Sequence, residues 1–272
     1  MLSNLKPILV KSQNEIILIT GSEGYIANNL IKNGIIVDIG AEEHKPSLVI
    51  HLAARPENSL AAYLSNIEAD TAVLHYCEIN NLPLLYISGN NVYPLELNCS
   101  EATNWSYNND LYPLSKIHTE SLLIKKMPRV KFIILRVADV FGANQRHGNF
   151  FRAMAKSIRE RRPLTLYGDG SKIRSYIYIK ELVSIMEYFS TRFAMNQNEV
   201  FNVCYNESPS IKDIVELLSQ LTGLPVERKD YPNNKSDVRT MTNDKLRQSG
   251  YEFHSNFMTA LQDFIKELTN ND

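Results

Sequence analysis

The stretch Ile16–Thr20 (IILIT), which runs directly into Gly21–Ala27 (GSEGYIA), decides the fold predicted for this chain. The first segment is apolar almost throughout and rich in β-branched residues, as is typical of a strand that helices cover on both faces. The second segment supplies a glycine turn, and a helical pattern follows it at Asn28–Lys32. A strand, a glycine turn and a helix in this order are what a dinucleotide-binding site requires.

The residues of this turn each have a physical task in that interpretation. Gly21 would permit a tight turn, and Gly24 would let the backbone approach a pyrophosphate, whose charge would lie at the helix N-terminus. Ala27 stands where a third glycine often serves helix–strand packing, and it is small enough for that position. An ordinary strand–turn–helix corner has the same pattern, but a position in the first βα unit favours the dinucleotide interpretation.

Short apolar runs alternate with helical patterns along the first half of the chain. The runs are Leu48–Leu52, Leu84–Ser88 and Phe132–Arg136, and apolar residues recur at i, i+3, i+4 spacing in Ala61–Asn80 and Ser115–Lys126. Such alternation favours βαβ units and therefore parallel pairing of the strands. We predict an α/β fold with a doubly wound parallel sheet.

The pattern changes after Phe141 and Gly142. Residues 149–162 and 256–268 have helical patterns, and residues 164–170 are typical of a strand that ends in a turn. The helix predicted at Ser210–Thr222 has a cap at Ser210, Asp213 at N3 and Gly223 at its end. This part is predicted to be a smaller mixed α/β domain. Residues 1–145 would then bind the dinucleotide, with 180–206 returning to that domain, and residues 146–179 and 207–272 would bind the substrate.

The composition excludes several classes of protein. The 272 residues contain 29 Lys and Arg against 30 Asp and Glu, a balance that argues against a nucleic-acid partner. No apolar stretch approaches the roughly 18 residues of a membrane span, and the N-terminal residues do not have the pattern of a signal peptide. The three Cys and six His lack the spacing of a disulfide framework or a metal site. A cytoplasmic, metal-independent protein is therefore expected.

Tyr112 and Lys116 form a second candidate motif, because a spacing of four places both side chains on one face at the start of a helix. A nearby ammonium and a positively charged nicotinamide ring would favour the phenolate form of Tyr112, which could act as a base at neutral pH. Lys116 could also hydrogen-bond the nicotinamide ribose. The Y-x-x-x-K pattern alone is common on protein surfaces, but here it follows both the glycine turn and the strand that ends at Ser88.

With these motifs together, the chain resembles the extended short-chain dehydrogenase/reductase family, in its NAD-dependent epimerase/dehydratase branch. Further matching segments are His51–Ala54 (HLAA), Leu135–Gly142 (LRVADVFG), Leu164–Gly170 (LTLYGDG), Arg174–Tyr178 (RSYIY), Phe201–Val203 (FNV) and Asp237–Arg239 (DVR). The resemblance covers most of the chain. It implies a Rossmann-like sheet, a nicotinamide dinucleotide as cofactor and a nucleotide-activated sugar as substrate.

The resemblance also implies roles for individual residues. Cofactor contacts are implied for Gly21, Gly24, Tyr25, Ile26, Leu52, Ala53, Ala54, Tyr112 and Lys116. Arg174 and Arg239 would meet the nucleotide diphosphate, a task that suits planar guanidinium groups, and Asn149 would lie near the same phosphates. Asn90 is a further candidate for contact with the substrate.

Two positions depart from the family's pattern. The family's catalytic Ser or Thr stands where this chain has Gly89, which leaves Ser88, one residue away, as the candidate hydroxyl. Sugar 4,6-dehydratases carry Asp-Glu at the next two positions, where this chain has Asn90 and Asn91. Because amides cannot serve as general acid and base at neutral pH, elimination of water is disfavoured.

A third departure is the short stretch between Gly21 and His51, which predicts a sheet trimmed by about one βα unit. Asp38 could be the acidic residue that binds the adenosine ribose, which would favour NAD over NADP. Alternatively, Asp38 could match the family's later Asp beside the adenine ring, with the ribose-binding strand lost. The expected cofactor is NAD or NADP, with NAD slightly favoured.

The predicted function is that of an NAD(P)-dependent nucleotide-sugar 4-epimerase or 4-keto-sugar reductase of surface-polysaccharide biosynthesis. The sequence does not separate a hydride returned to the opposite sugar face from a single net transfer. Gly89 and the short cofactor half motivate an alternative, a catalytically degenerate family member that binds a dinucleotide or a partner protein. By resemblance, a homodimer is expected, formed through paired helices at Ala61–Asn80 and Ser115–Lys126.

Overall fold

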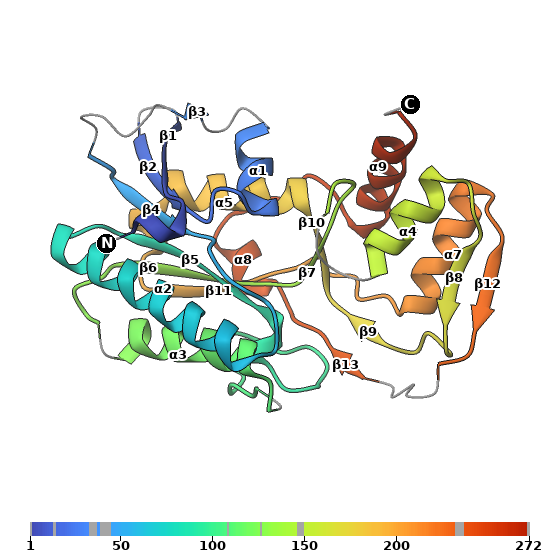
Figure 1. Cartoon of the computed structure of the whole chain (residues 1–272), viewed down its shortest axis with the longest axis horizontal. Helices are drawn as coiled ribbons and strands as arrows, with labels where there is room; N and C mark the ends of the chain where they lie inside the picture. The colour runs from blue at the N-terminus through green and yellow to red at the C-terminus, as the bar shows by residue number, and fades with distance from the viewer. Residues whose placement is uncertain are drawn as a thin grey trace.

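A seven-stranded mixed sheet organises the larger part of the molecule (Figure 1). The computed structural model describes residues 2–12, 15–32, 37–38, 45–107, 109–125, 127–145, 150–231 and 237–270. In spatial order, the strands are β11 (Glu199–Val203), β6 (Phe132–Val137), β5 (Leu84–Gly89), β4 (Leu48–His51), β2 (Glu15–Thr20), β1 (Ile8–Ser12) and β3 (Val37–Asp38). The first five of these strands are parallel to one another.

Helices cover both faces of this sheet, which explains the continuous apolar runs in its central strands. Helices α2 (Leu60–Asn80) and α3 (Leu111–Lys125) pack together on one face, and α1 (Tyr25–Lys32) and α5 (Ile179–Thr191) pack together on the other (Figure 1). All residues of β4 and β6 are buried as a result. The prediction of an α/β, mostly parallel sheet covered on both faces is confirmed.

One edge of the sheet differs from the purely parallel arrangement that the sequence predicts. Strand β1 is antiparallel to both of its neighbours, with Ile8 opposite Ile19 and Val10 opposite Asp38. It lies between β2 and β3, so β3 is not the direct neighbour of β2. The chain therefore continues the sheet beyond β2 with its own N-terminal strand, which forms a hairpin with β2 and needs no crossover helix.

The smaller part of the molecule is built from short strand pairs and helices. Its elements are α4 (Phe150–Arg159), α7 (Ile211–Thr222), α9 (Phe257–Thr269) and the parallel pair β8 (Leu164–Tyr167) and β12 (Val226–Lys229). Two parallel pairs lie between the two parts, namely β7 (Asp139–Phe141) with β10 (Tyr176–Tyr178), and β9 (Ile173–Arg174) with β13 (Val238–Arg239) (Figure 1). The remaining elements are η1 (Ser3–Leu5), η2 (Asn90–Val92), α6 (Phe193–Asn196) and α8 (Asp244–Gln248).

The caps predicted for α7 form as expected. Ser210 accepts a hydrogen bond from the Asp213 backbone, the Asp213 carboxylate accepts one in return, and Gly223 ends the helix with φ of 72°. Helix α4 ends at Arg159, before the predicted end at residue 162, because Arg161 has a positive φ of 49° that ends the helical geometry. The assignment of the two parts to cofactor and substrate stays a prediction.

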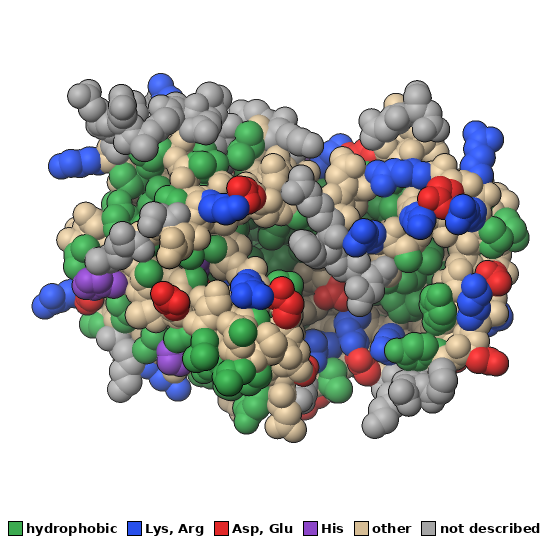
Figure 2. Space-filling view, viewed as in Figure 1, with side chains coloured by type: hydrophobic (Ala, Val, Ile, Leu, Met, Phe, Trp, Pro, Cys, Tyr) green, Lys and Arg blue, Asp and Glu red, His purple; other side chains and the backbone are tan. Residues whose placement is uncertain are grey.

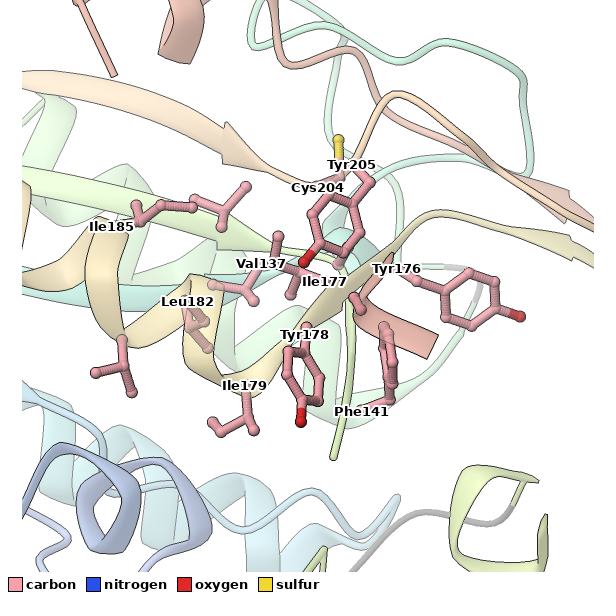
Figure 3. Close-up of a cluster of buried hydrophobic side chains, with 14 of the residues drawn as sticks. Val137, Phe141, Tyr176, Ile177, Tyr178, Ile179, Leu182, Ile185, Cys204 and Tyr205 are labelled. Atoms are coloured by element: carbon pink, nitrogen blue, oxygen red, sulfur yellow. The ribbon is translucent and has the colours of Figure 1, made fainter. Parts of the chain in front are cut away.

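A continuous apolar core joins the two parts (Figure 3). Phe141 of β7 stacks on Phe151 of α4, with ring centroids 4.5 Å apart, and lies 5.2 Å from the ring of Tyr178 in β10. The same cluster extends to Leu182 of α5, which packs under the large sheet. Because this core spans both parts, the surfaces that they present to each other are held in a defined arrangement.

Candidate active site

A cleft of about 680 Å³ opens at the carboxyl ends of the parallel strands β2, β4, β5 and β6. Figure 2 shows the molecule hollowed between its larger and smaller parts. Nine of the predicted site residues line this cleft: Gly24, Tyr25, Ile26, Leu52, Ala54, Ser88, Asn90, Tyr112 and Lys116. Residues that are far apart in the sequence meet here, because the ends of parallel strands share one edge of the sheet.

The glycine turn has the geometry that the sequence predicts for it. Gly21 has φ of 74°, and a side-chain carbon at this position would lie 2.6 Å from the backbone nitrogen of Ala53. Only glycine satisfies both conditions, since a left-handed φ and a close backbone contact each disfavour a Cβ atom. Helix α1 begins at Tyr25, directly after Gly24, so its free N–H groups face the turn. These features fit a dinucleotide pyrophosphate.

A second cavity of about 530 Å³ adjoins the cleft on the side of the glycine turn. The two cavities share Gly24, Leu52, Ala54 and Arg55, and the second one also contains Gly21 and Ala53. Asn4, Leu5 and Lys6 line it as well, and the Leu5 carbonyl accepts a hydrogen bond of 2.8 Å from the Gly21 backbone. The predicted cofactor residues therefore follow one path of two joined cavities, which fits an extended dinucleotide.

Two predicted site residues lie outside what the structure describes. Asn149 is not among the described residues, and for Asp38 the backbone alone is described, in β3. The position of β3 bears on the two interpretations of Asp38, because β1 separates β3 from β2. The place next to β2 is taken by a strand that runs in the opposite direction. The role of the Asp38 side chain stays a prediction.

Tyr112 and Lys116 project from the first two turns of α3 into the cleft. Asn58 fixes the start of this helix, since its side chain accepts a hydrogen bond from the Leu111 backbone and donates one to Asp110, both of 2.8 Å. The Lys116 ammonium is buried and lies 4.7 Å from the centre of the Tyr86 ring. The predicted pair is thus brought together with the glycine turn in one cavity.

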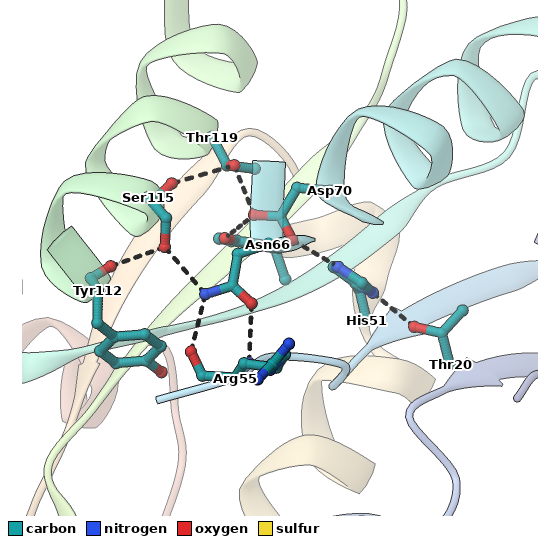
Figure 4. Close-up of polar contacts among 9 residues, drawn as sticks. Thr20, His51, Arg55, Asn66, Asp70, Tyr112, Ser115 and Thr119 are labelled. Carbon is teal, nitrogen blue, oxygen red and sulfur yellow. Dashed lines mark hydrogen bonds and ion pairs between the residues drawn. The ribbon is translucent and has the colours of Figure 1, made fainter. Parts of the chain in front are cut away.

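Sequence reasoning missed a buried network of polar side chains around Asp70 (Figure 4). Asp70 accepts hydrogen bonds from His51 Nε2 (2.7 Å), the Tyr86 hydroxyl (2.6 Å) and the Thr119 hydroxyl (2.6 Å). Burial by itself raises the pKa of Asp70, but Lys116 and these donors outweigh it and lower the pKa to about 2. Asp70 is therefore the counter-charge of the buried lysine.

At the end of β5, Gly89 stands where the resemblance implies a catalytic Ser or Thr. Gly89 offers no hydroxyl, and the Ser88 hydroxyl is buried without a hydrogen-bond partner among the described residues. A side-chain carbon at position 89 would lie 2.9 Å from Asn91 Oδ1. Asn90 donates a hydrogen bond of 3.1 Å to Asp139, the first residue of β7. An unpartnered buried hydroxyl beside Tyr112 and Lys116 is therefore available to a ligand in the cleft.

Arg174 and Arg239 stand directly opposite each other in the parallel pair β9 and β13. Arg174 forms an ion pair with Asp237, whereas the buried Arg239 Nε has no hydrogen-bond partner in the described part of the chain. Burial lowers the pKa of Arg239, and the positive charge of Arg174 lowers it further. Two adjacent guanidinium groups repel each other, and a bound anion would relieve that repulsion.

A third cavity of about 360 Å³ connects this cationic region to the cleft. It contains Arg174 and Tyr176, and it shares Asp139 and Gln145 with the larger cleft. Sequence reasoning did not single out Asp139, Tyr176 or Gln145. A signal for Asp139 was available, because a carboxylate three residues after Arg136 falls at the exit of a predicted strand.

None of the helices in the described ranges is long and apolar enough to cross a membrane. Within the same ranges, no three His, Cys, Asp or Glu side chains gather closely enough to hold a metal ion.

The mostly parallel sheet, the glycine turn and the cleft at the carboxyl ends of the strands together define a Rossmann-like α/β fold. The model of the NAD dependent epimerase/dehydratase family matches residues 35–204, which is more than half of the chain. The chain belongs to this family, and the resemblance found in the sequence is confirmed. The match begins after the glycine turn, so the geometry described above extends the likeness to that turn.

Individual relatives are distant. YtcB of Bacillus subtilis (strain 168), described as an uncharacterized UDP-glucose epimerase, is 26% identical over 208 residues, which cover 71% of this chain and 64% of YtcB. A UDP-glucose 4-epimerase of Thermotoga maritima, solved with UDP-glucose, has a TM-score of 0.77 at 21% identity and covers 94% of this chain and 99% of its own. RMD of Pseudomonas aeruginosa, solved with NADPH, has a TM-score of 0.76 at 16% identity, and the match covers 93% of this chain and 98% of RMD. The two structures show the shared fold.

Proposed function

We propose that this protein is an NAD(P)-dependent enzyme that acts on a nucleotide-activated sugar, as a 4-epimerase or a 4-keto-sugar reductase. One observation carries the proposal. Tyr112, Lys116 and the glycine turn converge on one cleft, and that cleft continues into a cavity with Arg174. A ligand with a sugar at one end and a diphosphate at the other matches this succession of groups.

The residues of the cleft divide the chemistry between them. When bound, the nicotinamide would accept a hydride from the sugar C4 or return one to it. Tyr112 would remove the proton of the C4 hydroxyl in the oxidative direction and give it back in the reductive direction. Lys116 would hold the nicotinamide ribose and supply positive charge beside Tyr112, and Ser88 would offer its unpartnered hydroxyl to the same sugar oxygen.

The cationic region would hold the nucleotide diphosphate. Arg239 has a buried nitrogen without a partner, and planar guanidinium groups bind phosphate oxygens in pairs. The Thermotoga maritima neighbour was solved with UDP-glucose, and YtcB is described as a UDP-glucose epimerase, which supports a UDP-sugar as the first ligand to test. Asn90 and Asn149 stay candidates for substrate contact.

The cofactor would be NAD or NADP, bound along the two joined cavities. The family description names NAD, and the Pseudomonas aeruginosa neighbour was solved with NADPH. NAD is the first choice on the interpretation that Asp38 binds the adenosine ribose. A place in surface-polysaccharide biosynthesis follows from the substrate class, because such polymers are assembled from nucleotide sugars.

A homodimer formed through α2 and α3 is the proposed assembly. These two helices pack side by side on one face of the sheet. Large apolar side chains on this pair are exposed, among them Leu60, Leu64 and Ile79 of α2 and Ile124 of α3. A second copy that covers them would remove that apolar surface from water.

The experiment that tests the function compares the parent protein with Tyr112→Phe. Each protein is incubated with UDP-glucose or UDP-galactose and with NAD or NADP, and both the reduced cofactor and the interconverted sugar are measured. We expect turnover in the parent and a loss of about 100-fold or more in the variant, which keeps the ring but lacks the hydroxyl. Tyr107→Phe, which removes a hydroxyl from an exposed tyrosine, is the matched control and should behave as the parent.

The outcomes separate the proposal from its alternative. Turnover that survives Tyr112→Phe would overturn the assignment of Tyr112. Tight binding of NAD(P) and UDP without turnover in the parent would support the catalytically degenerate member, for which Gly89 is the structural reason. A parent that binds neither ligand would remove the enzymatic interpretation altogether.

A further inference from the structure

Asp139 occupies the junction between the cleft and the cationic cavity. It is the first residue of β7, directly beyond the end of β6, and it lines both cavities. Tyr112 and Lys116 lie on one side of it, and Arg174 and Tyr176 lie on the other. A ligand that extends from Tyr112 into the cavity with Arg174 would cross the residues that the two cavities share, Asp139 among them, and in a nucleotide sugar the part between those ends is the sugar.

The surroundings of Asp139 leave it available to a ligand. Asn90 donates a hydrogen bond to Oδ1, and the side chain is otherwise open to the cleft. The Tyr176 hydroxyl is buried nearby without a partner among the described residues. The charged groups that face Asp139 are Arg174 and Arg239, which favour its ionised form, and Asp237, which opposes it. Asp139 is exposed to the cleft but is surrounded by protein atoms on its other sides, and this desolvation outweighs the effects of those groups and raises its pKa.

We propose that Asp139 is a specificity-determining residue whose carboxyl group contacts the sugar of the nucleotide sugar and excludes sugars that carry a carboxylate. The substrates are then neutral or amino hexoses, which can donate a hydrogen bond to Asp139, and hexuronic acids are rejected. This inference rests on the proposed function, since it requires a nucleotide sugar in the cleft. It adds a residue and a substrate class that the motifs of the chain do not assign.

The carboxylates of Asp139 and of a hexuronic acid would repel each other in this confined site. A hexose ring is only about 5 Å across, so a carboxylate on either of its edges would lie close to Asp139. At that separation and at the effective dielectric constant of a protein cleft, like charges repel enough to weaken binding by tenfold or more. Arg174 is already paired with Asp237, and the diphosphate of a bound nucleotide sugar would take up the remaining positive charge of the two arginines, so they would not cancel this repulsion.

The test measures dissociation constants by calorimetry for UDP, UDP-glucose and UDP-glucuronate, with the cofactor-loaded parent and with Asp139→Asn. The two sugars differ only at C6, where a hydroxymethyl group is replaced by a carboxylate. We expect the parent to bind UDP-glucose at least tenfold more tightly than UDP-glucuronate at pH 8. In Asp139→Asn, this ratio should fall to less than threefold, because the amide keeps the shape and removes the charge.

A matched control uses Glu57, another carboxylate that lines the cleft. Glu57 is exposed and paired with Arg55, so Glu57→Gln removes the same charge from the same cavity without changing the junction. The ratio of the two dissociation constants should stay at the parent value in this variant. A ratio that falls equally in both variants would overturn the proposal, because the effect would then belong to the overall charge of the cleft.

The dependence on pH gives a second readout that a purely structural role would not produce. As the pH is lowered from 8, the Asp139 carboxylate gains a proton and the repulsion disappears, so the parent ratio should shrink. Because desolvation raises this pKa, the change should begin at a higher pH than for an ordinary aspartate. The ratio in Asp139→Asn should not change as the pH is lowered. A constant parent ratio, or equal binding of both sugars at pH 8, would overturn the proposal while leaving the UDP site intact. Failure to bind UDP itself would overturn the proposed function and this inference together.

Discussion

Asp70 and Asp139 show that the same type of side chain can either support the site from within the protein or remain available to a ligand. Asp70 is buried in α2, where His51, Tyr86 and Thr119 donate hydrogen bonds to it. Asp139 opens onto the cleft with a hydrogen bond from Asn90. The pKa of Asp70 is lowered to about 2, whereas burial raises the pKa of Asp139. The charge of Lys116 and three hydrogen-bond donors outweigh burial at Asp70, whereas one donor and two arginines do not outweigh it at Asp139.

The difference separates what holds the site from what the site can bind. A carboxylate whose oxygens are satisfied by the protein has no capacity left for a ligand, so Asp70 acts on the cleft only through Lys116. A carboxyl group with few partners is costly to the fold and is available to a ligand. The same contrast distinguishes Thr119, which donates to Asp70, from Ser88, whose hydroxyl has no partner among the described residues.

The largest expected effect that tests this comparison is the loss of stability in Asp70→Asn. The substitution removes the counter-charge of buried Lys116 and replaces an acceptor with an NH₂ group that faces hydrogen-bond donors. Leaving a buried charge without its counter-charge typically costs about 3 to 5 kcal/mol. Urea denaturation at pH 7 should therefore show a fall of this size in the free energy of unfolding. Glu68→Gln, an exposed acid on the same helix, is the control and should change it by less than about 0.5 kcal/mol.

The second prediction concerns the acid dependence of stability. The pKa of Asp70 is about 2 in the folded protein, below its ordinary value of about 4, so its contribution is fully present above pH 4 and is lost as the pH falls toward 2. That contribution amounts to roughly 2 to 3 kcal/mol. The difference in unfolding free energy between the parent and Asp70→Asn should therefore shrink by about this amount between pH 5 and pH 2. A difference that does not depend on pH would show that Asp70 acts through packing alone.

The elements of the central sheet could be predicted from the sequence because their signals are local. The runs around Ile16–Thr20 and Leu84–Ser88, the turn at Gly21 and the caps of α7 each depend on neighbouring residues, and the structure has them where the patterns indicate. The cleft followed from the same signals, since parallel strands bring their ends together. The spacing of Tyr112 and Lys116 then placed both side chains in it.

The features that the sequence did not predict depend on pairing over a distance. The run Ile8–Ser12 is short and contains Lys11, and nothing within it indicates that it pairs between β2 and β3. Asp70 falls among the apolar positions of a helix, and its importance depends on His51 and Thr119, which come from β4 and α3. Contacts between elements that are distant in sequence have no signature in a local pattern.

The smallest expected effect is the one that would break the comparison most directly, the change in stability caused by Asp139→Asn. The pKa of Asp139 is raised in the folded protein, so the folded state holds the proton more tightly than the unfolded state does. Ionisation at neutral pH therefore works against folding, which is the reverse of Asp70. Asparagine removes this cost and can still accept the hydrogen bond from Asn90.

Urea denaturation at pH 7 should show that Asp139→Asn is as stable as the parent or slightly more stable. Any gain should vanish as the pH is lowered and the parent carboxylate is protonated. A loss of more than about 1 kcal/mol, which exceeds what surface substitutions usually cause, would mean that Asp139 is held by the fold as Asp70 is. Its place at the junction of the two cavities would then be structural, and the selection of the sugar would have to come from other residues of the cleft.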